Sequence, residues 1–265
     1  MTDHLIETFH DGIATLTMNR PEARNALTGE MQTALQEAIP RLAEDRKVRV
    51  VVITGAGRAF CAGGDVKGMG NGIAKAEVPL EDRIADLRTK QRTLTGALVA
   101  VRKPTIAALP GPAAGAGLAI ALACDIRIAA ESAIMATGYA RIGLTGDYGI
   151  NWLLTRLTGP ARARELMFLS ERIDARRCEA LGLVNRVVPD SELREAAFTL
   201  AKQLSEGPQI AFGRIKDNLD YALSSDLLDS MDYDAENLVR SARTNDHKEA
   251  VRAFVEKRKP TFAGD

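Results

Sequence analysis

The chain has 265 residues, of which 46% are hydrophobic and 26% charged, and this is enough for a large core in one polypeptide. Lys and Arg balance Asp and Glu at 35 each, so no excess of positive charge favours nucleic acid as a partner. We also expect no membrane association and a cytoplasmic location, because the sequence shows neither a basic-then-apolar leader nor an apolar run long enough to span a bilayer.

The cysteines and histidines predict neither disulfides nor a metal site. Cys61, Cys124 and Cys178 are widely spaced and odd in number, which favours reduced, mostly buried thiols. The three histidines lie near the ends of the chain and do not cluster with the cysteines, so we expect no bound metal.

Strands and helices alternate in the first half of the chain. Leu5 to Phe9 and Ile13 to Met18 predict two strands joined by a turn at Asp11-Gly12. Thr28 is the expected N-cap of a helix, and residues 50–55 predict a buried strand. Repeated units of this kind favour stacked β layers covered by helices, an α/β fold.

The second half is mostly helical. The pattern predicts helices over 80–101, 150–157, 161–170, 175–181 and 245–258, and a short strand over 183–188. From Ser191 onward no further strand is expected, and the leucines from Leu219 to Met231 predict one long helix. We therefore divide the chain into an α/β core, residues 1–190, and a helical region, residues 191–265, whose surplus apolar surface favours self-association.

Two stretches share one pattern: a buried strand, a turn of glycine and alanine, then a helix. The first runs from the Val50 strand through GRAFCAGGD, which ends at Asp65. The second breaks at Pro110-Gly111-Pro112 and passes through Ala113 to Gly117 into an apolar run. Such small residues leave backbone N–H groups open, so the two turns could place two donors on one oxygen, an oxyanion hole. The alternative is that small residues only permit tight packing between helix and strand.

GRAFCAGGDVK, followed about fifty residues later by GPAAGAGLAIALACDIRIA, resembles the crotonase (enoyl-CoA hydratase/isomerase) superfamily. RPEARNAL near the start and FVEKRKP near the end match the same family. The resemblance implies a crotonase spiral of ββα units with a C-terminal helical region that assembles homotrimers or dimers of trimers. It also implies an acyl-CoA thioester as substrate and no cofactor besides the coenzyme A of that substrate.

By this resemblance, the N–H groups of Gly64 and Ala116 would hold the thioester oxygen. Ala116 replaces the usual middle glycine of the family's turn, which keeps the N–H but adds a methyl group. The two glutamates of the family's hydratases are absent, because their positions hold Ala119 and Tyr139. Neither residue is a good base at neutral pH, which disfavours two-glutamate hydration. We expect Tyr139 to be a wall of the substrate pocket; the alternative is that its hydroxyl donates a hydrogen bond.

Asp147 matches an aspartate that dienoyl-CoA isomerases and ring-epoxide acyl-CoA isomerases use for proton transfer. We expect it to be the acid/base, because a carboxylate in an apolar pocket has a raised pKa suited to that role. The alternative is that Asp147 only caps the helix that begins near Gly149. Tyr148 is a weaker candidate for the substrate pocket. A dehalogenase is disfavoured, because the central histidine of those enzymes is missing.

The resemblance also implies a binding site for coenzyme A. Arg24 would contact the phosphates, with the backbone of Ala23 and Ala62 near the adenine. The remaining family positions for the nucleotide end are Lys67, Phe254 and Lys257, while Asp65 would orient the turn. For each basic residue the alternative is an ordinary solvated surface charge.

These patterns together predict an enoyl-CoA isomerase that stabilises a thioester enolate. Two alternatives stay open: an enoyl-CoA hydratase with non-standard residues, and a non-catalytic acyl-CoA-binding paralogue. A Rossmann dinucleotide site at Gly55-Ala56-Gly57 is disfavoured, because the third small residue and the acidic ribose partner are missing.

Overall fold

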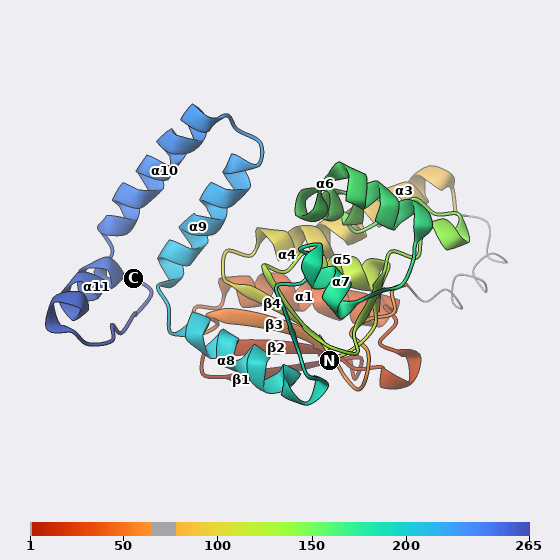
Figure 1. The fold of residues 1–265 in the computed structure, drawn as a ribbon, viewed down its shortest axis with the longest axis horizontal. Helices are drawn as coiled ribbons and strands as arrows, with labels where there is room; N and C mark the ends of the chain where they lie inside the picture. Colours follow the sequence, from red (N-terminus) through yellow and green to blue (C-terminus); the bar gives the residue numbers. More distant parts are fainter. Residues whose placement is uncertain (1, 65–77) are drawn as a thin grey trace.

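The computed structural model describes residues 2–64 and 78–265. A main sheet and a small sheet are surrounded by helices, and three further helices extend to one side (Figure 1). The main sheet contains β1 (Leu5–His10), β2 (Ile13–Met18), β3 (Val50–Gly55), β4 (Thr105–Leu109), β6 (Ile126–Ala130) and β9 (Arg186–Val188). The small sheet contains β5 (Ala113–Ala114), β7 (Ile134–Ala136) and β8 (Ile173–Asp174).

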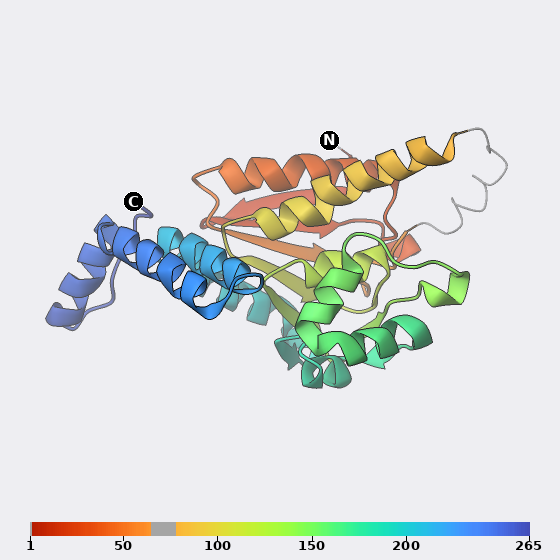
Figure 2. The ribbon, with the colours of Figure 1, turned by 90° about the horizontal axis from the view of Figure 1, so that it is seen from above.

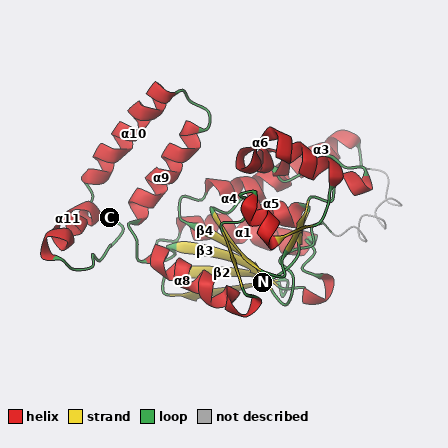
Figure 3. Cartoon of the chain, viewed as in Figure 1, coloured by secondary structure: helices red, strands yellow, loops and turns green. Residues whose placement is uncertain are grey.

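The helices occur throughout the chain and dominate after β9 (Figure 3). In the described parts of the chain, the α-helices are α1 (Gly29–Glu44), α3 (Leu80–Gln91), α4 (Ala97–Ala100), α5 (Ala116–Leu122), α6 (Ile150–Leu169), α7 (Ala175–Ala180), α8 (Leu193–Ser205), α9 (Gln209–Ala222), α10 (Leu227–Ala242) and α11 (Asn245–Glu256). A turn of π-helix, Arg92–Gly96, joins α3 to α4. The predicted single helix over 80–101 is therefore interrupted by one wider turn. A kink at Gly159, where φ is 76°, separates the two predicted halves of α6.

The main sheet has the order β1-β2-β3-β4-β6-β9 and is parallel except for its first pair. β1 and β2 form the predicted hairpin, in which His10 pairs with Ile13 across the turn Asp11-Gly12. Both turn residues have positive φ, 50° and 78°, as a two-residue type I′ turn requires. The small glycine at the second position makes this conformation accessible.

Alternate residues of the main sheet face two separate hydrophobic clusters. On one face, Leu16, Ile53 and Leu109 pack in the larger cluster, which also contains buried residues of α1 and α5. On the other face, Val52 and Ile106 pack with buried residues of α8. The two faces are thus covered by different helices, and Figure 2 shows α1 and the α3–α4 segment together on one side of the sheet.

Successive units contribute one strand to each sheet and then a helix. β4 lies in the main sheet and β5 in the small sheet, and α5 follows; β6, β7 and α6 repeat this order. The predicted stacked β layers are confirmed by this arrangement. Thr28 is the N-cap of α1 as expected, because its hydroxyl accepts a hydrogen bond from the backbone N–H of Met31 at 3.1 Å.

The prediction of one long helix from Leu219 to Met231 is wrong. The chain leaves α9 at Ala222 and begins α10 at Leu227, and the Asp226 side chain caps α10 by accepting a hydrogen bond from Asp229 N–H at 3.0 Å. The apolar residues of this stretch lie on the exposed faces of both helices, so their spacing looks like that of a single helix. In Figure 1, α9 and α10 form a hairpin that stands away from the sheets.

The predicted boundary at residue 190 falls before α8, which packs on the main sheet.

Candidate active site

The two glycine-rich turns meet. Cys61 and Ala113 form a parallel β-bridge, and the backbone N–H of Ala114 donates to the carbonyl of Cys61 at 2.9 Å. A Cβ atom at Gly63 would lie 2.7 Å from the carbonyl oxygen of Ala114 and 3.6 Å from the backbone nitrogen of Ala116. Gly63 also has φ of +91°, so only glycine fits both the conformation and the space.

The two predicted oxyanion donors therefore belong to adjoining segments of backbone. Gly64 follows Gly63 directly, and Ala116 begins α5 after Gly115, where φ is 52°. Within residues 2–64 and 78–265, neither the N–H of Gly64 nor that of Ala116 is engaged in a hydrogen bond. Two such open donors at one junction are what an oxyanion hole needs. Ala116 itself is 4% exposed, so its methyl group packs in the core.

Asp147 lies against Tyr139. The Tyr139 hydroxyl donates a hydrogen bond to Asp147 Oδ1 over 2.6 Å. Burial raises the pKa of Asp147, and the hydrogen bond from Tyr139 opposes part of that rise. The alternative in which Asp147 caps α6 with its side chain is not supported. The N-cap is Gly149, which has no side-chain cap, and only the carbonyl of Asp147 accepts from Ile150 N–H.

The structure shows the alternative expected for Tyr139, in which its hydroxyl donates a hydrogen bond. Tyr139 is 6% exposed, and its hydroxyl is used in the hydrogen bond to Asp147. The pKa of Tyr139 is raised, first by burial and then by the neighbouring Asp147 charge, so the hydroxyl keeps its proton at neutral pH. A Cβ at Gly115 would lie 3.8 Å from Tyr139 Oη, which places the hydroxyl beside the turn that carries Ala116. Ala119 is fully buried in the core cluster.

Tyr148 is held by a residue that the sequence did not single out. Its backbone has φ of 51°, and its N–H donates to Gln91 Oε1 at 2.9 Å. Gln91 is the last residue of α3, just before the π-helical turn, and no local pattern marks it. The Tyr148 side chain is 5% exposed, and burial, followed by the Asp147 charge, raises its pKa.

Three of the predicted coenzyme A residues are brought together. Ala23 ends a short 3₁₀ turn, Arg24 follows it with φ of 52°, and the backbone N–H of Ala62 donates to the carbonyl of Arg24 at 3.0 Å. Arg24 is exposed, as a phosphate contact requires. The buried Asn25, which sequence reasoning missed, fixes this loop by donating to the carbonyls of Ala56 and Ala59 at 3.0 and 2.8 Å. The RPEARNAL motif contains it and was the available signal.

The remaining predicted residues are not assembled in this way. Asp65 and Lys67 lie outside the described residues. Phe254 is on α11 with 85% of its surface exposed, and Lys257 is the C-cap of that helix. Both views place α11 at the opposite end of the molecule from the strands' glycine turns (Figures 1 and 2). A single chain therefore does not bring its own Phe254 and Lys257 to Arg24.

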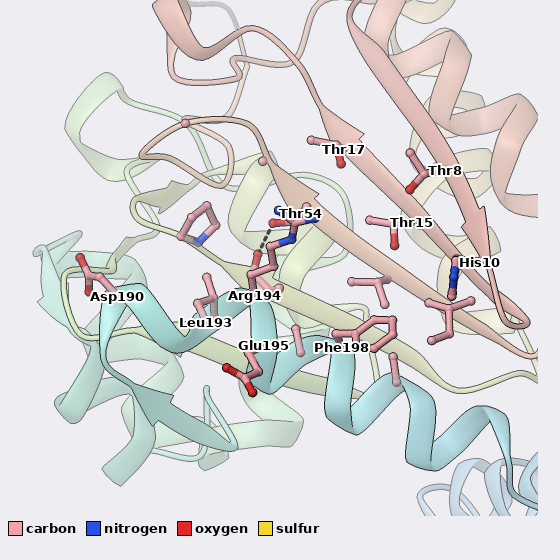
Figure 4. Close-up of a pocket in the computed structure, with 18 of the residues that line it drawn as sticks. Thr8, His10, Thr15, Thr17, Thr54, Asp190, Leu193, Arg194, Glu195 and Phe198 are labelled. Atoms are coloured by element: carbon pink, nitrogen blue, oxygen red, sulfur yellow. Dashed lines mark hydrogen bonds between the residues drawn. The ribbon is translucent and has the colours of Figure 1, made fainter.

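A groove of about 1090 Å³ lies on the face of the main sheet that α8 partly covers. Figure 4 shows threonines of β1 to β3 on one side and Phe198 and Glu195 of α8 on the other. Asp147 and Tyr139 do not line it. Its strand residues Ile13 and Val52 belong to the cluster opposite to that of Tyr139. The groove is thus separate from the candidate active site.

No metal centre and no membrane helix emerge from the described part of the chain. No group of three His, Cys, Asp or Glu side chains among residues 2–64 and 78–265 could hold a metal ion. The three cysteines are buried and free. Within the same residues, no helix is long and apolar enough to cross a membrane.

Comparison with known proteins gives one consistent picture. The family model described as "Enoyl-CoA hydratase/isomerase" matches residues 8–265. The chain is 34% identical over 264 residues to the 1,2-epoxyphenylacetyl-CoA isomerase of Escherichia coli, with 100% of both chains covered. It is 38% identical over 262 residues to the mitochondrial enoyl-CoA hydratase domain-containing protein 2 of Bos taurus, covering 97% of this chain and 86% of that one.

Solved structures agree. An enoyl-CoA hydratase from Polaromonas sp. JS666 superposes with a TM-score of 0.91 at 34% identity, covering 97% of this chain and 99% of that one. The match extends along nearly the whole chain and includes the C-terminal helices. The α/β crotonase spiral with its helical C-terminal region, expected from the sequence, is thereby confirmed.

Proposed function

Because the chain belongs to the enoyl-CoA hydratase/isomerase family, we propose that it isomerises a double bond or ring of an enoyl-CoA with Asp147 as acid and base. The observation that carries the proposal is the Asp147 carboxylate, half-buried and hydrogen-bonded to Tyr139 beside the turn that bears Ala116. A relative named as an isomerase supports it, since the two chains align from end to end.

The reaction would proceed through a thioester enolate. The N–H groups of Gly64 and Ala116 would donate to the thioester oxygen, which gains negative charge as Asp147 removes a proton from carbon. Losing one such donor typically costs about 3–4 kcal/mol of transition-state stabilisation. Asp147 would then return the proton at a different carbon, so that the double bond moves and no atom is gained or lost. The raised pKa of Asp147 suits both the removal of the proton from one carbon and its return to another.

A hydratase is the second candidate, favoured by the names of relatives such as the Bos taurus protein. Hydration needs one group to activate water and another to deliver a proton. Ala119 has no titratable group, and the Tyr139 hydroxyl already donates to Asp147. One carboxylate is enough for a proton shift within the substrate, and this is why we favour isomerisation. A non-catalytic acyl-CoA binder remains the third candidate.

The substrate's coenzyme A would lie along Ala23, Arg24 and Ala62, with Asp65 and Lys67 as further contacts. Phe254 and Lys257 could join this site only from a second copy of the chain, because their own α11 is remote from it. We therefore propose a homotrimer or a dimer of trimers in the cytoplasm. No cofactor is required beyond the coenzyme A of the thioester, since the chemistry is proton transfer alone.

The test is incubation of the purified protein with trans-2-, 3- and 2,5-dienoyl-CoA esters and 1,2-epoxyphenylacetyl-CoA in deuterated water. Mass and position of the label are followed for the wild type and Asp147→Asn. A rearranged ester without water addition, lost in the variant, supports the isomerase, and deuterium at carbon measures how far the proton on Asp147 exchanges with solvent before its return. A 3-hydroxyacyl product instead supports the hydratase. Binding of the esters without either reaction supports the non-catalytic binder.

A further inference from the structure

The loop that joins Tyr139 to Asp147 is folded back on itself. The carbonyl of Tyr139 accepts hydrogen bonds from Ile142 and Leu144 N–H, both at 3.0 Å. Gly143 and Gly146 have φ of +69° and +102°, which allows the tight return. Backbone bonds thus fold the first part of the loop back onto Tyr139, and the bond from the Tyr139 hydroxyl to the Asp147 carboxylate joins the two ends of the loop.

Among the described residues, one oxygen of the Asp147 carboxylate receives a side-chain hydrogen bond and the other receives none. Tyr139 donates to Oδ1, and among residues 2–64 and 78–265 no other side chain donates to this carboxylate. A carboxylate has two oxygens that can act as a base, and free rotation would present either one to a substrate. A fixed donor on Oδ1 removes that freedom, so the carboxylate is oriented before a substrate arrives.

We propose that Tyr139 is a positioning residue that holds Oδ1 of Asp147 and leaves Oδ2 to exchange the proton with the substrate. The proposal rests on the function proposed above and adds a residue to it. Tyr139 is suited to this task by its place as well as its hydroxyl. A Cβ at Gly115 would lie 3.8 Å from both Cζ and Oη of Tyr139, so the ring is seated between the oxyanion turn and the base.

Few titratable side chains in the described parts of the chain surround Asp147. Tyr139 faces it across the loop and Tyr148 adjoins it in sequence, with Asp86 of α3 close enough to act on Tyr148. α5 contributes no titratable side chain, and α6 contributes none in its first turn. Burial raises the pKa of Asp147 and the hydrogen bond from Tyr139 lowers it. Removal of the Tyr139 hydroxyl takes away the larger of the two effects that oppose burial, the smaller being a backbone hydrogen bond, so the pKa of Asp147 should move upward.

The experiment compares wild type with Tyr139→Phe, which removes the hydroxyl and keeps the buried ring. Carbon-13-labelled aspartate reports the titration of Asp147 by NMR in the ligand-free protein, with Asp147→Asn identifying the resonance. We expect the midpoint to move to higher pH in Tyr139→Phe. The acidic limb of the kcat/KM profile should move in the same direction, because the base must be ionised to act.

Two further variants sharpen the test. Tyr148→Phe removes a neighbouring buried hydroxyl that has no bond to Asp147, and the Asp147 titration should stay where it is in wild type. Replacement of Tyr139 by 3-fluorotyrosine gives a stronger donor, and the titration should move to lower pH than in wild type. In Tyr139→Phe we expect kcat to fall about tenfold to a hundredfold, with KM changed by less than about threefold.

An unchanged Asp147 titration in a folded Tyr139→Phe protein overturns the proposal, as does a lowered one. An equal shift in Tyr148→Phe also overturns it, because the effect would then come from local packing. If the titration shifts as expected but the wild type isomerises none of the CoA esters, the hydrogen-bond role of Tyr139 stands and the proposed function fails instead.

Discussion

Apolar side chains are buried around the glycine turns of the core, whereas those of the α9–α10 hairpin lie at the surface. Leu118 and Ile120 of α5 are at most 2% exposed. Leu227 and Leu238 of α10 are 74% and 72% exposed, and neither α9 nor α10 has a buried residue. One chain therefore buries the apolar side chains around the glycine turns by itself. It leaves those of the hairpin exposed, and apolar surface of this extent favours burial against another surface.

The contacts that attach the hairpin to the core are also of another kind. Lys216 of α9 reaches Asp125 at 2.7 Å, and Asp125 in turn accepts from the N–H and hydroxyl of Thr105. Arg102 contacts Asp217 and Asp220, both at 2.9 Å. Backbone hydrogen bonding and close packing hold the turns together, while ion pairs attach the hairpin to the core. The four predictions that follow test this difference.

The largest effect is expected from a methyl group placed where the turns touch. In Gly117→Ala, the added Cβ would lie 2.4 Å from the carbonyl oxygen of Cys61 and 2.7 Å from its sulfur. Backbone cannot yield as a flexible side chain can, so we expect a loss of about 3 kcal/mol in the free energy of unfolding. Urea denaturation measures it. Gly29→Ala, in the first turn of α1, is the matched control, since nothing lies within 4 Å of its Cβ, and it should not destabilise the protein.

Charges added to the α9–α10 hairpin should change the assembly of the chains and leave the folding of each chain unchanged. The double variant Leu227→Glu and Leu238→Glu places two carboxylates on exposed positions of α10. We expect the mass in sedimentation to fall to that of one chain, with the circular dichroism spectrum unchanged. Asp232→Asn, on the same helix, should keep the wild-type mass. A wild-type chain that sediments as a monomer at all concentrations would contradict the proposed trimer.

A smaller effect is expected at the ion pair between Lys216 of α9 and Asp125. Lys216→Met removes the ammonium group from Asp125, whose carboxylate is 31% exposed and keeps its bonds to Thr105. We expect a loss of about 1 kcal/mol, measured by thermal unfolding, and faster hydrogen exchange in α9 than in α5. Lys47→Met, at an exposed turn, should change neither quantity. Equal hydrogen-exchange rates in α9 of both variants would show that other contacts attach α9 to the core.

The smallest response is expected from thiol reagents. Burial raises the pKa of the Cys61 thiol to about 11 and that of Cys124 to about 12, so almost no thiolate exists at pH 8. We expect no labelling of the folded protein by a disulfide reagent over an hour, and three labelled thiols after denaturation. Rapid labelling of one thiol in the folded protein would show that the core opens locally.

Much of the core could be predicted from the sequence because its signals are local. Alternating strands, the Thr28 cap and the Asp11-Gly12 turn each depend on a few adjacent residues, and all three are confirmed. The meeting of the two glycine turns was expected from their shared pattern, although the same small residues also suit tight packing between helix and strand. These features fix the backbone positions of Gly64 and Ala116 before any side-chain contact is considered.

Other features depend on contacts that no local pattern describes. The leucine spacing over 219–231 suits one helix as well as two, and only the cap formed by Asp226 separates them. The bond from Tyr139 to Asp147, eight positions apart, requires the chain between them to fold back, which depends on the positive φ of Gly143 and Gly146. Gln91 reaches Tyr148 from α3, far away in sequence. Tertiary placement decided each of these.

The close approach of Gly117 to Cys61 also bears on oxidative damage. The space beside the Cys61 sulfur is already filled, since even one additional carbon on Gly117 would lie 2.7 Å from it. A sulfenic oxygen needs similar room, and a protonated, enclosed thiol reacts slowly with peroxide. Oxidised Cys61 should therefore arise only in molecules whose turns have separated, so that its oxidation state in an aged sample records how often the core has opened.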